Sequence, residues 1–274
     1  APAQPVGKPL NEAAVWQRAL IMAAGAFMNF LLGFVVMVIL IAAQSEPITS
    51  RVIYAIDDGA LCGQTGLEAG DQVLAVNGRR CFVANDMLYE LMRTEDYSAR
   101  FTVLRGGEKV ELPCVRFDTW QDDSGETHMS LGFTVYGIRK TPANVVKEAW
   151  NSVLYYGRII FTSLMDLLRG RESINDLSGP VGIVTAIGQA ASYGWQDLLQ
   201  MLALITVNLG IFNLLPFPAL DGGKVVFLLI EGVTGHAVPE KIQSGLTLAA
   251  FALFFGLMLF ATYNDILRLI TGAV

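Results

Sequence analysis

Three long uncharged segments divide the chain. No charged residue occurs in 19–45, in 198–220 or in 242–264. About 20 apolar residues suffice for a helix to cross the hydrocarbon core of a bilayer, whereas a buried helix of a soluble protein rarely runs that far without a polar face. The pattern therefore predicts three membrane-spanning helices.

The polarity pattern changes between the first two spans, because residues 46–140 carry most of the charges. The apolar positions of Val73–Val76 precede Asn77-Gly78, which predicts a strand that ends in a tight turn. Residues 100–115 form a hairpin pattern around two glycines, and 83–92 have helical periodicity. We expect a water-exposed α+β domain, built as a small β-barrel with one or two helices.

The segment after this domain has two parts. Apolar residues recur at helical intervals among charges in 142–168, which predicts an amphipathic helix against the membrane or the domain. Residues 177–196 are uncharged, but Gly179-Pro180 and Gly182 make them a poor spanning helix. We expect this part to be re-entrant or packed at the surface.

The expected fold is a multi-pass α-helical membrane protein with an inserted α+β domain. With 53% hydrophobic residues, only 16% charged residues and a net charge of −6, the chain suits a lipid bilayer as partner. The lack of a basic run argues against nucleic acid. The predicted segments are a membrane-proximal N-terminus (1–18), a transmembrane helix (19–45), the α+β domain (46–140), the amphipathic and re-entrant or surface segments (141–196), a broken transmembrane segment (197–234) and a C-terminal transmembrane helix (235–274).

One face of the first span carries small and amide residues. Gly25, Asn29 and Gly33 recur every four positions, as in close helix–helix contacts. Packing alone explains the glycines. Asn29 is harder to explain by packing, because a polar side chain that faces lipid is costly.

The second apolar segment contains a predicted break. Pro216 and Pro218 cannot both lie inside a regular helix, because each proline removes a donor and clashes with the preceding turn. Unwound backbone at membrane depth must be buried in protein or line a polar cavity. Asp221 follows immediately, and three interpretations are open: an N-cap of a helix over 223–230, an ion or proton site of a transporter, or a metal ligand.

Part of the inserted domain resembles PDZ domains of bacterial membrane-associated proteases. The string Gly66-Leu-x-x-Gly-Asp71-x-Val-Leu-x-Val-Asn-Gly78 fixes a loop, a strand and a turn in register. The resemblance implies a module that captures extended peptides at a sheet edge. Leu131-Gly132-Phe133 imitates part of a PDZ carboxylate-binding loop, but its place after the hairpin favours a closing strand, so the peptide-binding residues stay unassigned.

The segment from Asn213 to Gly223, Asn-x-x-Pro-x-Pro-x-Leu-Asp-Gly-Gly, resembles the signature of the site-2 protease family of intramembrane zinc proteases, in its regulator-of-sigma-E branch. The order of parts agrees, including Ser178-Gly-Pro-Val-Gly-Ile183. The resemblance implies a Zn²⁺ cofactor with Asp221 as its third protein ligand. It also implies that residues around Asp221 support the active site or the substrate strand: Asn208, Asn213, Pro216, Pro218, Gly222 and Asn29.

The chain departs from this family in two places. Ala26 stands where the family has proline, which is a small change. The family's H-E-x-x-H segment, with two zinc-binding histidines and a general-base glutamate, does not occur, and the two histidines, His128 and His236, lie in other contexts. We therefore expect this segment and its catalytic glutamate upstream of Ala1, and expect the chain as given to be inactive.

The resemblance implies a function for the intact protein: a zinc metalloendopeptidase of the bacterial cytoplasmic membrane, with its PDZ domain outside the cytoplasm. Its substrates would be single-span membrane proteins, either anti-sigma factors or signal-peptide remnants. The alternative is a catalytically inactive PDZ adaptor anchored in the membrane. A transporter is a weaker third interpretation, because three spans without an inverted repeat do not fit one.

Overall fold

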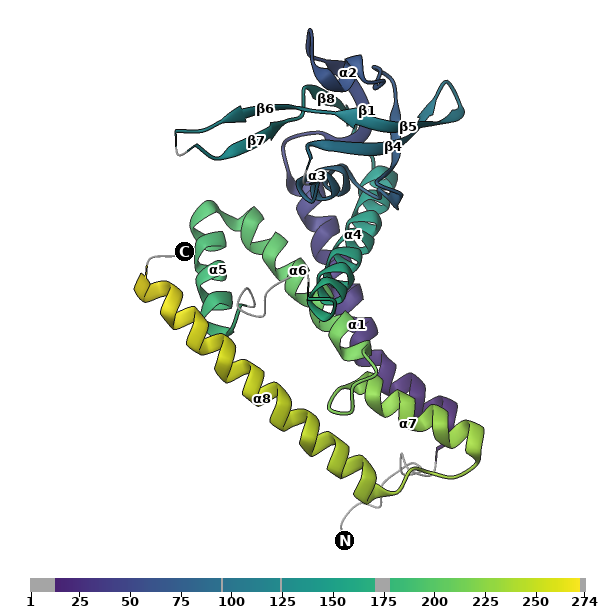
Figure 1. The fold of residues 1–274 in the computed structure, drawn as a ribbon. Helices are drawn as coiled ribbons and strands as arrows, with labels where there is room; N and C mark the ends of the chain where they lie inside the picture. The colour runs from purple at the N-terminus through teal and green to yellow at the C-terminus, as the bar shows by residue number, and fades with distance from the viewer. Residues whose placement is uncertain (1–12, 95, 124, 171–177, 272–274) are drawn as a thin grey trace. The chain divides into compact units, whose positions relative to one another are not determined.

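A computed structural model describes residues 13–94, 96–123, 125–170 and 178–271, so that the predicted N-terminal segment 1–18 is described only from residue 13. These residues form eight helices and eight strands, many of which are labelled in Figure 1. The elements are α1 (Val15–Ala43), β1 (Ile48–Ile56), α2 (Leu61–Gln64), β2 (Gln72–Val76), β3 (Arg79–Arg80), α3 (Ala84–Met92), β4 (Ser98–Arg105), β5 (Glu108–Arg116), β6 (Asp118–Gln121), β7 (Thr127–Ser130), β8 (Phe133–Ile138), α4 (Pro142–Leu168), α5 (Pro180–Tyr193), α6 (Trp195–Leu214), α7 (Asp221–Thr234) and α8 (Glu240–Thr271).

The chain forms two compact units. Residues 38–155 make one unit, here called the β unit, and residues 1–37 with 156–274 make the other, here called the helical unit. Among the residues that the structure describes, three helices, α1, α6 and α8, are long and apolar enough to cross a membrane. These helices correspond to the three predicted spans, so the chain is a membrane protein with a β domain.

The β unit is organised around an antiparallel sheet. Its strand order is β5-β4-β2-β1-β8, with β3 paired to β2, and β6 and β7 form a separate two-stranded sheet. The predicted hairpin is confirmed by the β4–β5 pair, in which Val103 lies opposite Val110. The sheet is open in the described residues, with β5 and β8 at its two ends, rather than a closed barrel. Phe133 begins β8, which pairs with β1 as the expected closing strand.

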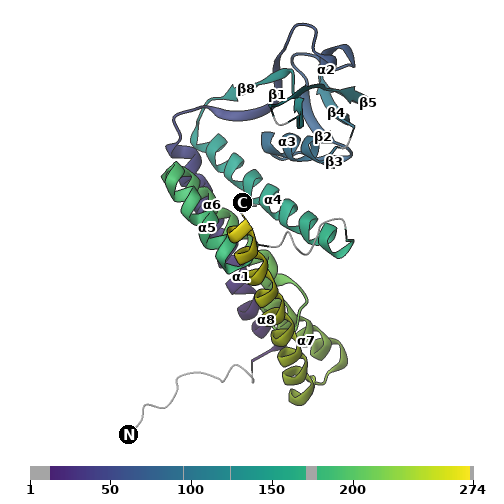
Figure 2. The ribbon, with the colours of Figure 1, turned by 60° about the vertical axis from the view of Figure 1, so that its left-hand side comes forward.

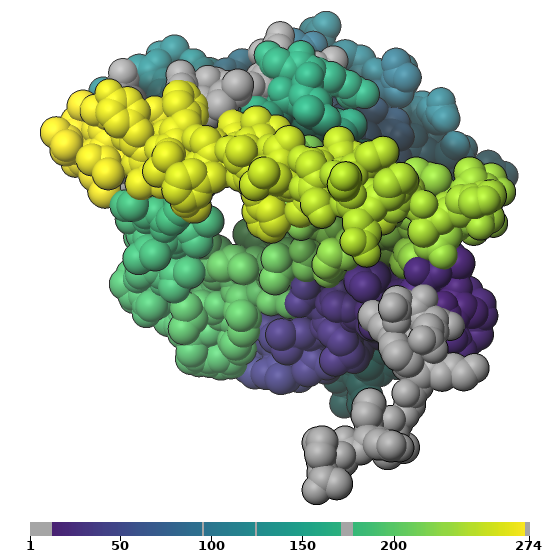
Figure 3. All heavy atoms as spheres, turned by 90° about the horizontal axis from the view of Figure 1, so that it is seen from below, coloured from purple at the N-terminus to yellow at the C-terminus, as the bar shows by residue number. Residues whose placement is uncertain are grey.

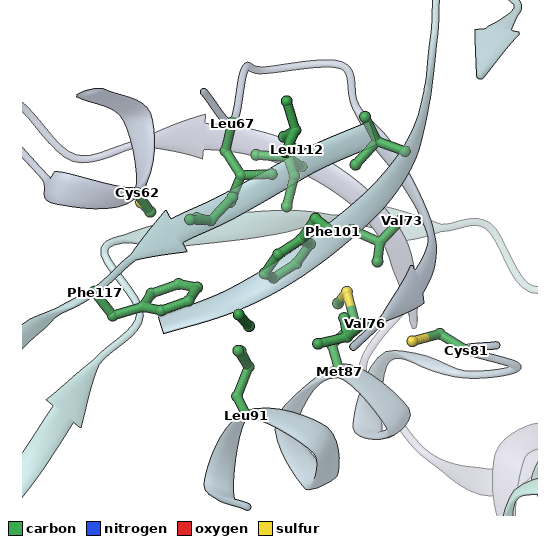
Figure 4. Packing of buried hydrophobic residues seen from close by; sticks show 14 of the residues in the cluster. Cys62, Leu67, Val73, Val76, Cys81, Met87, Leu91, Phe101, Leu112 and Phe117 are labelled. Carbon is green, nitrogen blue, oxygen red and sulfur yellow. The ribbon is translucent and has the colours of Figure 1, made fainter. Parts of the chain in front are cut away.

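The core of the β unit is apolar and fully enclosed. Phe101, Val73, Val76 and Val103 have no solvent exposure. Figure 4 shows the Phe101 ring among side chains of the strands, with Met87 and Leu91 of α3 below it. The helical pattern of 83–92 is thus confirmed as α3, whose apolar side closes this core.

One buried ion pair explains the sequence motif around Gly66 and Asp71. Asp71 is fully buried, and its two carboxylate oxygens accept hydrogen bonds from Arg105 at 2.7 and 2.8 Å. The same guanidinium donates to the Gly66 carbonyl at 2.7 Å and to Glu68 at 2.6 Å. A buried carboxylate needs such a partner, so the motif ties the loop before β2 to the end of β4.

In the helical unit, α1 and α6 pack with their backbones close together (Figure 2). A Cβ atom on Gly33 would lie 2.7 Å from a methyl group of Val207, and one on Gly210 would lie 3.2 Å from the Phe30 ring. Ala26 and Ala203 are fully buried in the same unit. Small residues allow this approach, which confirms a packing role for Gly33.

The remaining predicted features concern helix ends. The predicted helix break around the two prolines is present, because α6 ends at Leu214 and α7 begins at Asp221. The helix predicted over 142–168 is α4, which begins at Pro142 and ends at Leu168. Within 177–196 the described residues form the helix α5, which begins with Pro180 at its first position. Its 14 residues reach about 21 Å at 1.5 Å per residue, too short to cross a bilayer.

Candidate functional site around Asp221

Asp221 begins α7 directly after the break in the second apolar segment. The N-cap position belongs to Leu220, and no side-chain cap hydrogen bond is present at this helix end. The interpretation of Asp221 as an N-cap is therefore wrong. The Asp221 carboxylate does not cap α7. It faces α1, since a Cβ atom on Gly25 would lie 3.6 Å from the Asp221 Oδ2 atom.

The turn before Asp221 is held by its own backbone. The Phe217 N–H donates to the Leu215 carbonyl at 2.7 Å, and the Leu220 N–H donates to the Phe217 carbonyl at 2.9 Å. Pro216 and Pro218 lie in this turn, where neither has to donate a hydrogen bond. The two prolines thus fix a compact reversal between α6 and α7.

The two glycines after Asp221 are required by close packing of backbone on backbone. A Cβ atom on Gly222 would overlap the Leu215 carbonyl oxygen, and one on Gly223 would overlap the Phe217 carbonyl oxygen. Both glycines are buried. The Asp-Gly-Gly sequence therefore allows the start of α7 to pack tightly against the preceding turn. This packing fixes the position from which the Asp221 carboxylate projects.

The asparagines of the signature segment differ in their surroundings. Asn208 lies on α6, and its side-chain oxygen is buried without a hydrogen-bond partner in the described part of the protein. Asn213 near the end of α6 and Asn29 of α1 are half-buried. A buried acceptor left unpaired is unfavourable by about 1–3 kcal/mol, so Asn208 is suited to bind a donor from outside the described residues.

Charged residues of α7 and α1 form two ion pairs in this part of the helical unit. Lys224, one turn along α7, places its ammonium 3.4 Å from Asp221 Oδ1, and the Asp221 side chain is 35% exposed. Farther along α7, Glu231 forms a two-pronged ion pair with Arg18 of α1, with one N–O distance of 3.2 Å. This pair lines a pocket of about 660 Å³ together with Lys224, Phe227 and Glu240. The Arg18–Glu231 pair escapes sequence reading because it joins residues 213 positions apart.

Each of the two histidines has a local partner of its own. His128 is in β7 of the β unit, where Nε2 is 3.0 Å from Asp122 Oδ2, and the exposed His236 follows α7 with Nδ1 3.0 Å from the Thr234 carbonyl. Within the described residues, Asp122, Glu126 and His128 form the group whose ligand atoms all lie within 4.8 Å of one another, and Asp221 is not part of it. At this site the described chain thus contributes a single carboxylate.

The relationship to known proteins follows from sequence comparison. The profile of Peptidase family M50 matches residues 2–257. The chain is 31% identical over 265 residues to the regulator of sigma-W protease RasP of Bacillus subtilis, covering 97% of this chain and 62% of that protein. It is 34% identical over 251 residues to the zinc metalloprotease RasP of Geobacillus kaustophilus, covering 91% and 59%. A putative zinc metalloprotease of Agrobacterium fabrum, Atu1380, is 28% identical over 271 residues, covering 95% and 72%.

The match covers only part of the length of these relatives. The chain spans about three fifths of the length of the two RasP proteins. The profile match extends over both units, from before α1 into α8, and the relatives cover nearly the whole chain. The chain belongs to Peptidase family M50, the site-2 protease family, as the Asn213–Gly223 segment predicted.

Proposed function

We propose that the chain is the part of an intramembrane zinc metalloendopeptidase that supplies Asp221 as a zinc ligand. The observation that carries this proposal is the carboxylate itself. It stands at the first residue of α7, directly after the break in the apolar segment, does not cap this helix, and faces the neighbouring helix α1. A carboxylate within the membrane normally has a partner; in the described residues Lys224 pairs with the Asp221 Oδ1 atom at 3.4 Å, and we propose that zinc is the further partner.

The donor at this site fits zinc as one ligand of a larger set. Carboxylate oxygen binds Zn²⁺ at about 2.0–2.2 Å, and a catalytic zinc takes three protein ligands. The other two would come from a histidine pair of the H-E-x-x-H type upstream of Ala1, and the glutamate of that segment is the expected catalytic base. When bound, zinc would polarise the scissile carbonyl and activate a water molecule.

The chain's own residues would position the reacting groups. Gly222 and Gly223 hold the start of α7 against the turn, so that the Asp221 carboxylate projects from a fixed backbone. The unpaired oxygen of Asn208 would accept a hydrogen bond from the backbone of an extended substrate. Asn213, Asn29 and the two prolines would support this arrangement from α6, α1 and the turn.

The proposed substrates are single-span membrane proteins, either anti-sigma factors or signal-peptide remnants. The printed name of the Bacillus subtilis relative, a regulator of sigma-W protease, supports a regulatory role. The protein would cross the bacterial cytoplasmic membrane several times, through the predicted segments 19–45, 197–234 and 235–274. Residues 46–140 would form a PDZ-like domain on the extracytoplasmic side, which docks or filters substrates. An inactive PDZ adaptor is the alternative, and the zinc metalloprotease names of the relatives do not favour it.

Cleavage of a membrane-anchored reporter by the full-length protein tests this proposal. We expect Asp221→Asn to abolish cleavage, because an amide is a far weaker zinc ligand than a carboxylate. The matched control is Asp197→Asn, since Asp197 is also an acid in the first turn of its helix and is exposed. Unchanged cleavage by Asp221→Asn would remove Asp221 from the mechanism. A wild-type protein with neither zinc nor cleavage would support the adaptor.

A further inference from the structure

The C-terminal helix α8 touches the rest of the helical unit along one narrow face. Its buried residues are Ala250, Ala261 and Asp265. Thr247 and Phe254 fall on the same face, because all five positions are separated by three, four or seven residues. In the most apolar part of α8, only 11% of the residues are buried. The few contacts on this face therefore determine where the helix lies.

Asp265 attaches one end of α8 to the beginning of α5. Its carboxylate is buried and accepts hydrogen bonds from the Gly179 N–H at 3.1 Å and the Gly182 N–H at 2.8 Å. The first N–H groups of a helix have no partner within the helix, and a negative charge is favourable there. Asp265 therefore caps α5 from a position more than 80 residues later in the sequence.

Both glycines are needed for this contact. A Cβ atom on Gly179 would lie 2.7 Å from Asp265 Oδ2 and 2.8 Å from the backbone of Ala261, and one on Gly182 would lie 3.0 Å from Asp265 Oδ1. Pro180 at the first helical position has no N–H to satisfy,. The Ser-Gly-Pro-Val-Gly segment thus has a physical role, which is to receive α8.

The same face of α8 holds the turn that precedes Asp221. The Thr247 hydroxyl donates to the Pro218 carbonyl at 3.1 Å, and the Phe254 ring lies 4.7 Å from the Phe217 ring. Figure 3 shows a hollow between α8 and the neighbouring helices α5 and α6. The helix α8 therefore connects two contacts. Asp265, near its C-terminal end, binds the start of α5, and Thr247 and Phe254, nearer its N-terminal end, contact the turn before Asp221.

We propose that Asp265 is a positioning residue for the protease site. It fixes α8 on α5, and α8 in turn fixes the Phe217–Pro218 turn from which Asp221 projects. This inference rests on the proposed function for its effect on cleavage, whereas its effect on the turn is independent of any activity. We assign Asp265 a positioning role rather than a catalytic one, because each of its oxygens accepts a hydrogen bond from a backbone N–H group at the start of α5.

A reversible covalent tether tests this role in the full-length protein. Asp265→Ala should lower kcat by about 10- to 100-fold with little change in KM, because a misplacement of about 1 Å can have that effect on catalysis. The double variant Gly182→Cys, Asp265→Cys should be equally impaired when reduced. Oxidation should restore kcat to within about threefold, since a disulfide then replaces the hydrogen bonds. Cys114 is exposed and is changed to serine in this background.

Amide hydrogen exchange gives a readout that does not need activity. In Asp265→Ala we expect faster exchange at Gly182 and also at Phe217 and Leu220, near the other contact of α8. The control is Tyr263→Phe on the exposed face of α8, which is 61% exposed and should leave exchange and cleavage unchanged. Unchanged exchange at the turn in Asp265→Ala would overturn the proposal, as would a formed disulfide without recovery. If the wild-type protein does not cleave the reporter, amide exchange at the turn still tests whether Asp265 positions that turn.

Discussion

The two units of the protein bury their side chains in opposite ways. The β unit encloses Phe101 completely, whereas Phe255 on α8 of the helical unit is 59% exposed. The β unit is held by a water-excluding core, while the helical unit relies on glycine contacts, single polar contacts and surrounding lipid. Stability therefore resides in apolar side chains in one unit and in close backbone contacts in the other.

Among the substitutions that test this difference between the units, the largest expected effect comes from adding one methyl group to the helical unit. Gly223→Ala would force a Cβ atom onto the Phe217 carbonyl, so the turn and Asp221 must move. We expect a loss of cleavage of about 100-fold, by the sensitivity of catalysis to misplacement. The matched control is Gly245→Ala in α8, where a Cβ atom meets open space. Equal activity of the two variants would contradict the packing account of the Asp-Gly-Gly sequence.

A pair of identical substitutions separates the two kinds of burial. Phe101→Ala should destabilise the β unit by about 3–5 kcal/mol, because it leaves a cavity in a closed core. Phe255→Ala on the exposed face of α8 should change stability by no more than about 0.5 kcal/mol. Hydrogen exchange of the Val73 and Val103 amides in the intact protein reports the first change. Similar losses for both variants would show that α8 is packed against protein rather than lipid.

The smallest expected effect concerns pH and the β unit. Burial raises the pKa of the Glu148 carboxyl in α4, against the lowering effects of an Asn151 hydrogen bond and the charges of Arg51 and Lys147. The folded unit then binds this proton more tightly than the unfolded chain, so stability rises as pH falls through the raised pKa and stops rising below the ordinary carboxyl pKa.

Glu148→Gln should remove this part of the pH dependence and stabilise the β unit slightly at neutral pH. The control is Glu111→Gln in β5, which is exposed. Thermal unfolding followed between pH 4 and pH 8 measures both variants. A pH slope that is the same in wild type and Glu148→Gln would show that Glu148 does not contribute.

Sequence reasoning succeeded where the signal is local. Uncharged runs predicted α1, α6 and α8, and the two prolines predicted the break before Asp221, because length and proline geometry act within a few residues. The short β6–β7 sheet was missed, since its four-residue strands carry little periodicity. The bounds of α4 came from apolar spacing alone.

The contacts that position the site could not be predicted in the same way. Asp265 sits at the end of an apolar run and looks like an interfacial charge, and nothing local shows that Gly179 and Gly182 bind it. The N-cap interpretation of Asp221 failed because α7 begins at Asp221, two residues before the expected start at Gly223, and Leu220 takes the N-cap position. Such contacts depend on tertiary packing between segments far apart in sequence.

The zinc content of the purified full-length protein tests the central claim most directly. We predict about one zinc ion per wild-type chain and per Asp197→Asn chain, and a large loss in Asp221→Asn, because removal of one of three protein ligands weakens a catalytic zinc site. Equal zinc in Asp221→Asn and wild type, measured after dialysis against a chelator, would contradict the assignment of Asp221 as a ligand.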